Sequence, residues 1–314
     1  MSIKAYSIRI NGIVQGVGFR PHVYRLAMEF DLKGWVLNSS AGVFLEVEGE
    51  EESLRGFMQR LQSEPPPRAL IRSCEMSEIS PGRFNEFTIR QSHDDGKTTA
   101  MISPDIAMCA RCQQEVSDVK DRRYRYPFTN CTNCGPRFTI IKDLPYDRAM
   151  TTMASFPMCP ECQAEYDNPL NRRFHAQPNA CPACGPRMTL VDSQDQPVDK
   201  DVRDLLKAGY IVAVKGLGGF HLAVNALDAN AVLRLRQRKR RDAKPFAVMV
   251  RDLATAYQHC VINAGEEGLL SSPQGPIVIL ERRSDSTLPA EGHSSRIENS
   301  GGDAALYSSA LPAV

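Results

Sequence analysis

Two hydrophobic periods run through the first ninety residues. A period of two, as in residues 6–10, predicts strands with one buried face, and a period near 3.6 predicts helices with one buried stripe. The predicted strands are 6–10, 34–38, 43–48, 71–79 and 84–89, and the predicted helices are 22–30 and 51–62. The order strand, helix, strand, strand, helix, strand is that of a ferredoxin-like sandwich.

Residues 200–284 carry a second hydrophobic pattern. A helix is predicted at 201–208, a short apolar strand at 211–214, a helix at 228–241 and another strand at 246–250. On the helix at 228–241 we expect Val232, Leu233 and Leu235 to face inward. Alternating strands and helices predict a partial α/β domain.

The stretch between these two patterns is poor in large apolar side chains and rich in cysteine. It holds eight of the ten cysteines as four Cys-x-x-Cys pairs, and the second two pairs repeat the first two after fifty residues. The eight are Cys109, Cys112, Cys131, Cys134, Cys159, Cys162, Cys181 and Cys184. The repeat extends to neighbouring residues, because Arg122-Arg123 corresponds to Arg172-Arg173.

Tetrahedral zinc explains this spacing. Each Cys-x-x-Cys turn supplies two thiolates, and a second turn completes four ligands with no position left for water. We therefore predict two structural Zn²⁺ sites whose binding energy is also folding energy. Ligands from one repeat are the default grouping, and pairing outer with outer and inner with inner pairs is the alternative. Disulfides and redox thiols are weaker interpretations, and His175 is expected not to be a ligand.

Composition and charge add little to these predictions of domains and metal sites. The chain is 42% hydrophobic and 24% charged, with a formal net charge of +1, so no global charge favours nucleic acid or membranes. There is no apolar run of membrane-spanning length and no apolar start typical of a signal peptide. Metal-ligating thiols then predict a reducing, cytoplasmic location.

A glycine-rich segment follows the first predicted strand. Gly12, Gly16 and Gly18 let backbone N–H groups turn toward an anion, and Pro21 suits the first turn of a helix. The loop would place a phosphate at a helix N-terminus. Arg20 lies at the junction, where its guanidinium can bind phosphate or carboxylate oxygens.

The segment from Gly12 to Arg20, together with residues 34–38, resembles the acylphosphatase family over about ninety residues. The resemblance implies that Arg20 holds the phosphate group and that Asn38 orients the attacking water. It also implies a phosphate-binding loop of Gln15, Gly16, Val17, Gly18 and Phe19. An acyl phosphate has a good leaving group, so positioning and charge stabilisation suffice without a protein nucleophile.

The 200–284 region resembles the first half of the YrdC-like family, which binds ATP, makes acyl-adenylates and in some members binds RNA. The residues that carry this resemblance are Lys215-Gly216, an arginine-rich helix end and the segment 244–249. The implied nucleotide-binding residues are Lys215, Arg236, Arg238, Lys239 and Lys244. A basic helix end that only complements the helix dipole is the alternative.

Taken together, the chain is predicted to be an α+β multidomain protein. Its divisions are an acylphosphatase-like domain at 1–91, a linker at 92–108, a tandem zinc-finger domain at 109–190, a partial YrdC-like domain at 200–284 and a disordered or aberrant tail at 285–314. This order resembles the HypF carbamoyltransferases of nickel–iron hydrogenase maturation.

The HypF resemblance implies a reaction path. Carbamoyl phosphate is hydrolysed at Arg20 and Asn38, and the carbamate passes internally to the YrdC-like site. There ATP, with Mg²⁺, converts it to carbamoyl-adenylate, and a further domain transfers the carbamoyl group to a cysteine of a HypE-type partner. The family continues well beyond 314 residues, so we expect this chain to be truncated and to lack the transferase domain.

Two other functions remain open from sequence. The first is a zinc-dependent nucleic-acid-binding module that uses the basic helix and the basic and aromatic residues at 122–128. The second is a stand-alone acylphosphatase. Packing around the metal is the plainer interpretation of residues 122–128.

Overall fold

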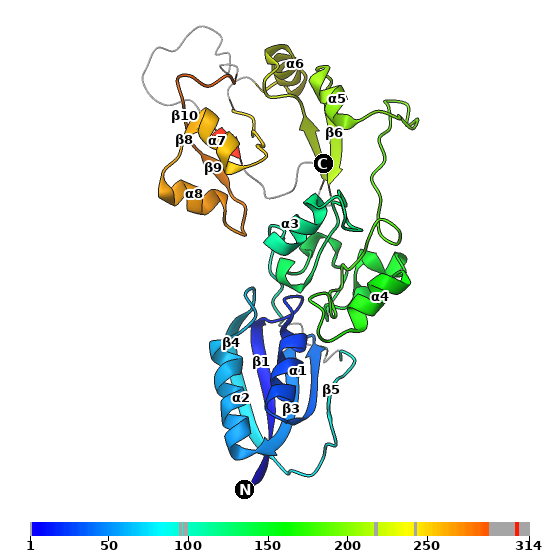
Figure 1. Ribbon diagram of the computed structural model, residues 1–314, viewed down its shortest axis with the longest axis vertical. Coiled ribbons are helices and arrows are strands. Elements are labelled where there is room, and N and C mark those ends of the chain that lie inside the picture. The colour runs from blue at the N-terminus through cyan, green and yellow to red at the C-terminus, as the bar shows by residue number, and fades with distance from the viewer. Residues whose placement is uncertain are drawn as a thin grey trace. The chain divides into compact units, whose positions relative to one another are not determined.

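The computed structural model describes residues 2–93, 96, 100–216, 219–241, 244–288 and 305–307. These fall into two compact units, Met1–Pro186 and Arg187–Val314, which we describe separately (Figure 1). Within the described ranges no helix is long and apolar enough to cross a membrane. Of the predicted linker, residues 94, 95 and 97–99 lie outside the described residues.

The first unit begins with a five-stranded sheet. Its strands are β1 (Ile3–Ile13), β2 (Lys33–Ser39), β3 (Gly42–Glu50), β4 (Leu70–Ile79) and β5 (Phe87–Ile89), in the order β4-β1-β3-β2-β5. Neighbouring strands are antiparallel except for β2 and β5, which are parallel. With α1 (Phe19–Glu29) and α2 (Glu51–Ser63), they confirm the predicted ferredoxin-like sandwich, with β5 as an added edge strand.

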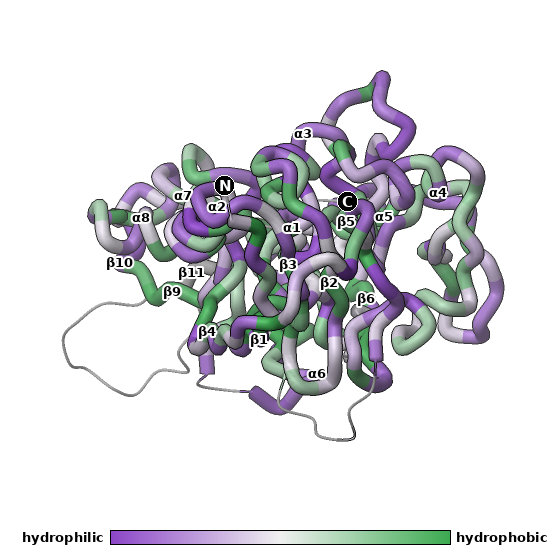
Figure 2. Tube along the Cα trace, turned by 90° about the horizontal axis from the view of Figure 1, so that it is seen from below, coloured by the Kyte–Doolittle hydropathy of each residue, from purple (hydrophilic) through white to green (hydrophobic). Residues whose placement is uncertain are grey.

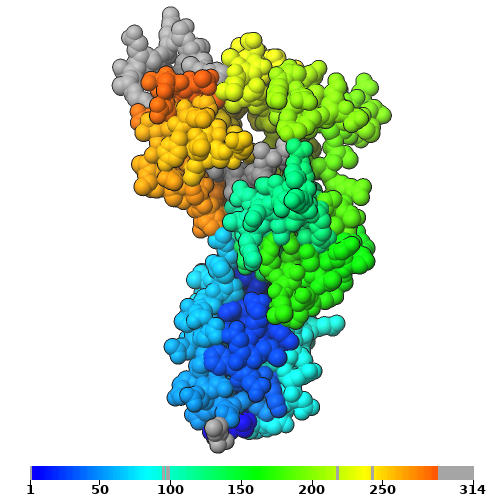
Figure 3. Space-filling view, in the orientation of Figure 1, coloured from blue at the N-terminus to red at the C-terminus, as the bar shows by residue number. Residues whose placement is uncertain are grey.

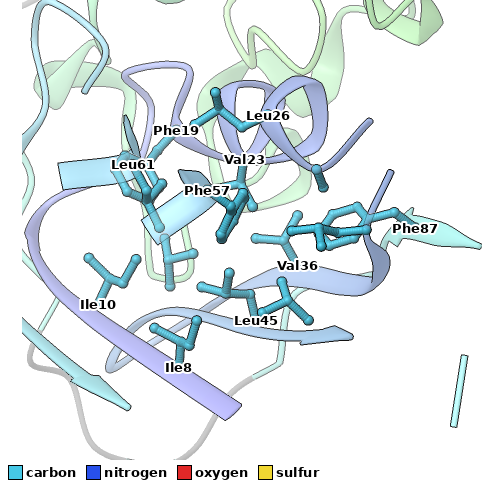
Figure 4. Packing of buried hydrophobic residues seen from close by; sticks show 14 of the residues in the cluster. Ile8, Ile10, Phe19, Val23, Leu26, Val36, Leu45, Phe57, Leu61 and Phe87 are labelled. Atoms are coloured by element: carbon cyan, nitrogen blue, oxygen red, sulfur yellow. The ribbon is translucent and has the colours of Figure 1, made fainter. Parts of the chain in front are cut away.

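The core of this sandwich lies between the sheet and its two helices. Alternate residues of β1 and β3, such as Ile8 and Leu45, are at most 1% exposed and meet Val23 of α1 and Phe57 of α2 (Figure 4). In Figure 2 hydrophobic (green) and hydrophilic (purple) stretches are interleaved along the chain. Burying a side chain as large as Phe57 contributes about 2–3 kcal/mol.

The cysteine-rich part of the first unit has little regular structure. Two short helices, α3 (Ala110–Ser117) and α4 (Pro160–Asp167), each begin directly after the first cysteine of a repeat. Between them lie four 3-10 turns, η1 (Thr132–Cys134), η2 (Phe138–Ile140), η3 (Arg148–Met150) and η4 (Thr152–Ser155). The small cluster of buried side chains around α3 consists largely of cysteines, and a second small cluster holds Tyr126, Ile140, Met153 and Ala180. Metal ligation would therefore add to a core that is small for a region of this length.

The second unit consists of short elements. In chain order they are α5 (Val202–Lys207), β6 (Val212–Gly216), β7 (Gly219–Ala223), α6 (Ala229–Lys239), α7 (Leu253–His259), β8 (Cys260–Val261), α8 (Ala264–Leu270), β9 (Ile277–Ile279), β10 (Glu281–Arg282) and β11 (Ala305–Tyr307). They form three two-stranded sheets, β6-β7, β8-β10 and β9-β11.

Two details of the second unit differ from the sequence prediction. Residues 246–250 form no regular strand, since the segment is irregular apart from a single bridge at Met249. Leu233 faces solvent with 52% exposure, whereas Ala231 and Leu235 are buried on α6. The buried face of α6 therefore runs through Ala231, Leu235 and Arg236, with Val232 half-buried at its edge. Most of the predicted tail, 289–304 and 308–314, lies outside the described residues.

Candidate functional site

The glycine loop connects β1 to the N-terminus of α1. Gly16 and Gly18 adopt positive φ angles of 72° and 79°, and Gly18 is the N-cap residue of α1. Left-handed backbone at both positions favours glycine. A Cβ on Gly16 would lie 2.7 Å from Cβ of Pro136 and 2.8 Å from the ring of Tyr146, so the loop packs tightly against the cysteine-rich region.

The structure brings Arg20 and Asn38 together at this loop. Arg20 is 7% exposed at the start of α1, and Asn38 is 1% exposed on β2. With the Asn38 amide oriented so that its oxygen faces the guanidinium, that oxygen lies 3.1 Å from Nε and 3.2 Å from Nη2 of Arg20. The pair predicted from sequence is therefore assembled in one buried place.

A narrow pocket opens beside this pair. Its lining residues are Val14, Gly16, Gly18, Phe19, Arg20, Pro21, Asn38, Tyr146, His175 and Gln177. Its volume of about 10 Å³ holds roughly one water molecule. Three of the lining residues come from the cysteine-rich region, so both parts of the first unit build the pocket (Figure 3 shows their blue and green surfaces meeting).

The other two predicted loop residues are buried. Gln15 donates through Nε2 to the carbonyls of Ser39 (2.6 Å) and Gly42 (3.1 Å), and its Oε1 accepts from the backbone N–H of Tyr146 (3.0 Å). Val17 belongs to the hydrophobic core of the sandwich. Their positions favour a part in shaping the loop, and direct contact with phosphate stays a prediction for both.

Sequence reasoning missed the residues that the cysteine-rich region places at the pocket. Asp147 accepts a hydrogen bond from Nη2 of Arg20 at 3.0 Å, and Gln177 donates to the same oxygen at 3.4 Å. The ring of His175 stacks on Tyr166, and burial together with the charge of Arg20 lowers the pKa of His175 to about 4. Their only sequence signal is proximity to the cysteines, which does not predict a pocket.

The eight predicted metal ligands form two groups, one from each repeat. Cys109, Cys112, Cys131 and Cys134 make one group, and Cys159, Cys162, Cys181 and Cys184 make the other. This is the default grouping expected from sequence, and it excludes the outer-with-outer alternative. His175 is in neither group that the described residues form.

The spacing of these sulfurs fits a tetrahedral metal. The Sγ atoms of Cys109 and Cys131 are 3.6 Å apart, and those of Cys181 and Cys184 are 3.8 Å apart. A Zn–S bond of about 2.3 Å gives a tetrahedral edge of about 3.8 Å. Both groups therefore fit zinc-finger sites in which thiolates occupy all four ligand positions.

The paired arginines of each repeat contact the metal group of the other repeat. Arg172 donates to Sγ of Cys112 at 2.9 Å and forms an ion pair with Glu115 at 2.5 Å. In the reciprocal contact, Arg122 donates to Sγ of Cys162 at 3.4 Å.

Arg123 and Arg173 extend this exchange. Arg123 donates to the carbonyl of Ala180 and is ion-paired with Glu165 at 2.6 Å, while Arg173 is ion-paired with Glu115. Burial opposes ionisation of Glu165, but hydrogen bonds from Arg123 and Arg122 lower its pKa to about 2.

These contacts bear on the prediction that residues 122–128 form a stacking surface for bases. Arg123 is 2% exposed and Tyr126 is 5% exposed, and the hydroxyl of Tyr126 donates to the carbonyl of Pro186. Side chains already packed and bonded in this way are not available to stack on a base. The geometry therefore favours packing around the metals for Arg123 and Tyr126, whereas Tyr124 and Arg125 are exposed.

The predicted nucleotide-binding residues lie on three segments of the second unit. Lys215 is on β6, its Nζ 5.8 Å from the ring centroid of Phe220. Arg238 and Lys239 end α6, and Lys244 is exposed in the segment after it. Leu217 and Gly218, next to Lys215, lie outside the described residues.

Arg236 differs from the other four because it is only 7% exposed. Its Nη1 donates to the carbonyls of Arg241 (2.7 Å) and Lys244 (3.3 Å), and its guanidinium lies 4.7 Å from the ring centroid of Phe246. It braces the segment that carries Lys244, so nucleotide contact by Arg236 itself stays a prediction.

Family models match three parts of the chain. The acylphosphatase model matches residues 6–89, the HypF finger model matches 108–141 and 158–191, and a model described as telomere recombination, for the Sua5/YciO/YrdC group, matches 204–299.

Curated relatives agree with this order. Carbamoyltransferase HypF2 of Cupriavidus necator is 51% identical over 285 residues, which cover 88% of this chain and 35% of that protein. Carbamoyltransferase HypF of Synechocystis is 50% identical over 287 residues, covering 90% and 37%. The acylphosphatase of Thermotoga maritima is 40% identical over 89 residues, 28% of this chain and 98% of that enzyme. The chain thus spans about a third of the length of the HypF relatives.

Solved structures give the same result. The crystal structure of a full-length HypF in its phosphate- and nucleotide-bound form matches with a TM-score of 0.85 and 45% identity, over 99% of this chain and 39% of that one. The structure of HypF from T. kodakarensis matches with a TM-score of 0.85 and 44% identity, over 97% and 39%.

Proposed function

Because this chain belongs to the HypF carbamoyltransferase family, as an N-terminal portion of it, we propose that its acylphosphatase fold hydrolyses carbamoyl phosphate. The observation that carries the proposal is the buried pair of Arg20 and Asn38 beside a glycine loop at the N-terminus of α1. Backbone N–H groups and the guanidinium together suit a phosphate dianion.

In the proposed reaction, Arg20 binds oxygens of the phosphate group and Asn38 orients a water molecule toward phosphorus. The new bond joins the water oxygen to phosphorus, and the bond from phosphorus to the carbamate oxygen breaks with its electron pair. Carbamate and inorganic phosphate are released, and the proton from water passes to phosphate oxygen. Positioning and charge stabilisation are the only contributions asked of the protein.

We assign the second unit to the next reaction of the family. There carbamate would attack the α-phosphate of ATP to give carbamoyl-adenylate and pyrophosphate, with Mg²⁺ bound to the nucleotide. The match of residues 204–299 to the YrdC group supports this assignment, with Lys215 and Lys244 as the exposed cations nearest to that role. Transfer of the carbamoyl group to a cysteine of a HypE-type partner is proposed for the whole family protein.

The thiolate groups support two further parts of the proposal. Two groups of four cysteines at tetrahedral spacing suit Zn²⁺ in both sites, because a closed thiolate set is typical of structural zinc. Eight metal-binding thiols also favour a reducing compartment, and we propose the cytoplasm.

The first test is phosphate release from carbamoyl phosphate. Arg20→Ala and Asn38→Ala should each lower kcat by about 10²- to 10³-fold, as expected for losing a preorganised donor or orienting group. Arg9→Ala, on the sheet outside the pocket, serves as a matched arginine control and should keep activity within about twofold. Hydrolysis that survives both pocket variants unchanged would show that the reaction occurs elsewhere.

A further inference from the structure

The cysteine-rich region contributes a carboxylate to the acylphosphatase site. Asp147, the residue before η3, accepts from Nη2 of Arg20 at 3.0 Å, although the two residues are far apart in sequence. The side chain of Arg20 is 8% exposed and that of Asp147 is 31% exposed. A partly buried ion pair of this kind holds its arginine more firmly than a surface pair does.

Both neighbours of Asp147 are anchored, so the carboxylate is not on a loose loop. Tyr146 is 1% exposed, and its backbone N–H donates to Gln15 Oε1 at 3.0 Å. The guanidinium of Arg148 donates to the carbonyls of Gln177 at 2.6 Å and Phe156 at 2.6 Å.

Gln177 fixes the carboxylate from its other side. It is 1% exposed, and its Oε1 accepts from the backbone N–H of Arg148 at 2.8 Å and from the Tyr166 hydroxyl at 2.9 Å. These two donors orient the amide so that Nε2 points toward Asp147, 3.4 Å from Oδ1. Asp147 is therefore part of a built network that ends on Arg20.

The remaining contacts of Arg20 show what this network does to the guanidinium. Nη1 donates to Oγ of Ser92 at 3.3 Å, and Nε and Nη2 face the oxygen of Asn38. A guanidinium is a planar fork with five N–H donors, so three fixed partners determine the direction of its plane. Its orientation toward a phosphate then depends on Asp147, the one charged partner among the three.

We propose that Asp147 is a positioning residue for Arg20 in acyl-phosphate hydrolysis, so that the first active site is composite and incomplete without the zinc-binding region. The inference rests on the proposed function. Asp147 has two effects of opposite sign. It orients the guanidinium for the transition state, and its negative charge lowers the affinity of the same site for a phosphate dianion.

Because the two effects oppose each other, removing the charge of Asp147 should lower kcat and strengthen phosphate binding. Asp147→Asn should lower kcat for carbamoyl phosphate by about 10- to 100-fold, because small misplacements of a positioned group cost that much. The dissociation constant for inorganic phosphate, measured by calorimetry, should fall by about threefold or more because a negative charge is removed. A residue that only docked the two regions would weaken both.

Two further variants complete the experiment in the full chain with zinc bound. Asp147→Glu keeps the charge and should restore part of kcat. Asp143→Asn makes the same charge change at an exposed aspartate of the same segment, and should leave kcat and phosphate affinity within about twofold. If Asp147→Asn keeps kcat within twofold of wild type, Asp147 is not a positioning residue and the inference is wrong.

The phosphate measurement separates this inference from the proposed function. Suppose that the zinc-loaded wild type hydrolyses no carbamoyl phosphate, so that the proposed function fails. Phosphate binding that is lost in Arg20→Ala and strengthened in Asp147→Asn would still support control of Arg20 by Asp147. Phosphate binding left unchanged by Asp147→Asn would overturn it.

Discussion

At the scale of single residues, burial without a charged partner determines the behaviour of two histidines. Desolvation, together with the charge of nearby Arg25, lowers the pKa of His22 on α1 to about 4. Burial likewise lowers the pKa of His175 at the pocket to about 4. Both imidazoles are therefore neutral at pH 7, so neither supplies positive charge to a bound phosphate.

The lowered pKa of His22 makes stability depend on pH. The unfolded chain takes up a proton near pH 6.5, whereas folded His22 does so only near pH 4. The stabilisation is therefore complete above about pH 6.5 and is lost as pH falls toward 4. Between pH 7.5 and pH 5, the unfolding free energy of wild type should fall by about 1 kcal/mol more than that of His22→Leu. This value allows for partial solvent screening.

Urea unfolding of both proteins at the two pH values measures this difference, and acid loss of zinc affects both proteins equally. An NMR titration of wild type gives the pKa directly. A His22 midpoint near 6.5 would contradict the prediction.

At the scale of elements, the two metal groups form one unit. A divalent ion with four thiolates carries a net negative charge, and each group has arginines from the other repeat beside its sulfurs. Arg122 and Arg172 thus neutralise charge across the repeat boundary. Such contacts tune metal affinity and orient ligands, so loading one site should favour loading of the other.

Replacing Arg122 or Arg172 should therefore weaken metal binding in the other repeat, whose cysteine that arginine contacts. Arg172→Ala removes the contact to Cys112, and we expect the first site to lose about 10- to 100-fold in zinc affinity. Competition with a chromophoric chelator measures this affinity. Arg111→Ala, an exposed arginine next to Cys112, is the control. Equal zinc affinities in both variants and wild type would refute the coupling of the sites.

At the scale of the whole molecule, the metals and the acylphosphatase pocket belong to one compact unit. Residues 146, 175 and 177 line the pocket, and the region that carries them has two small buried clusters, one of them made largely of the predicted metal ligands. We therefore expect metal binding to contribute to the shape of a pocket whose proposed catalytic residues lie in the sandwich.

Removal of zinc should consequently lower an activity in which zinc takes no chemical part. After complete chelation we expect hydrolysis of carbamoyl phosphate to fall at least about tenfold, and addition of Zn²⁺ should restore it. Phosphate release and zinc content are measured on the same samples. Full activity in a metal-free chain would show that the sandwich works alone and that the zinc-binding region is not needed for the first step.

The sequence by itself determined the local elements and the metal groups. Hydrophobic periods encode which face of each strand or helix is buried, so the five strands and two helices of the sandwich were predicted within a few residues. The fifty-residue repeat predicted the grouping of the cysteines, because ligands of one metal lie close together in each copy. Arg20 and Asn38 were found through the family resemblance, since both stand in its motif.

Only the tertiary structure decided which side chains meet between segments. A hydrophobic period shows that a face is buried but not what covers it. The sequence therefore did not indicate that Asp147, Tyr146 and Gln177 lie at the pocket. The exchange of arginines between repeats was hidden for the same reason. The exposure of Leu233 was missed in the same way, because Ala231 and Leu235 form the buried face of α6. Packing between distant segments depends on three-dimensional contacts that no local pattern records.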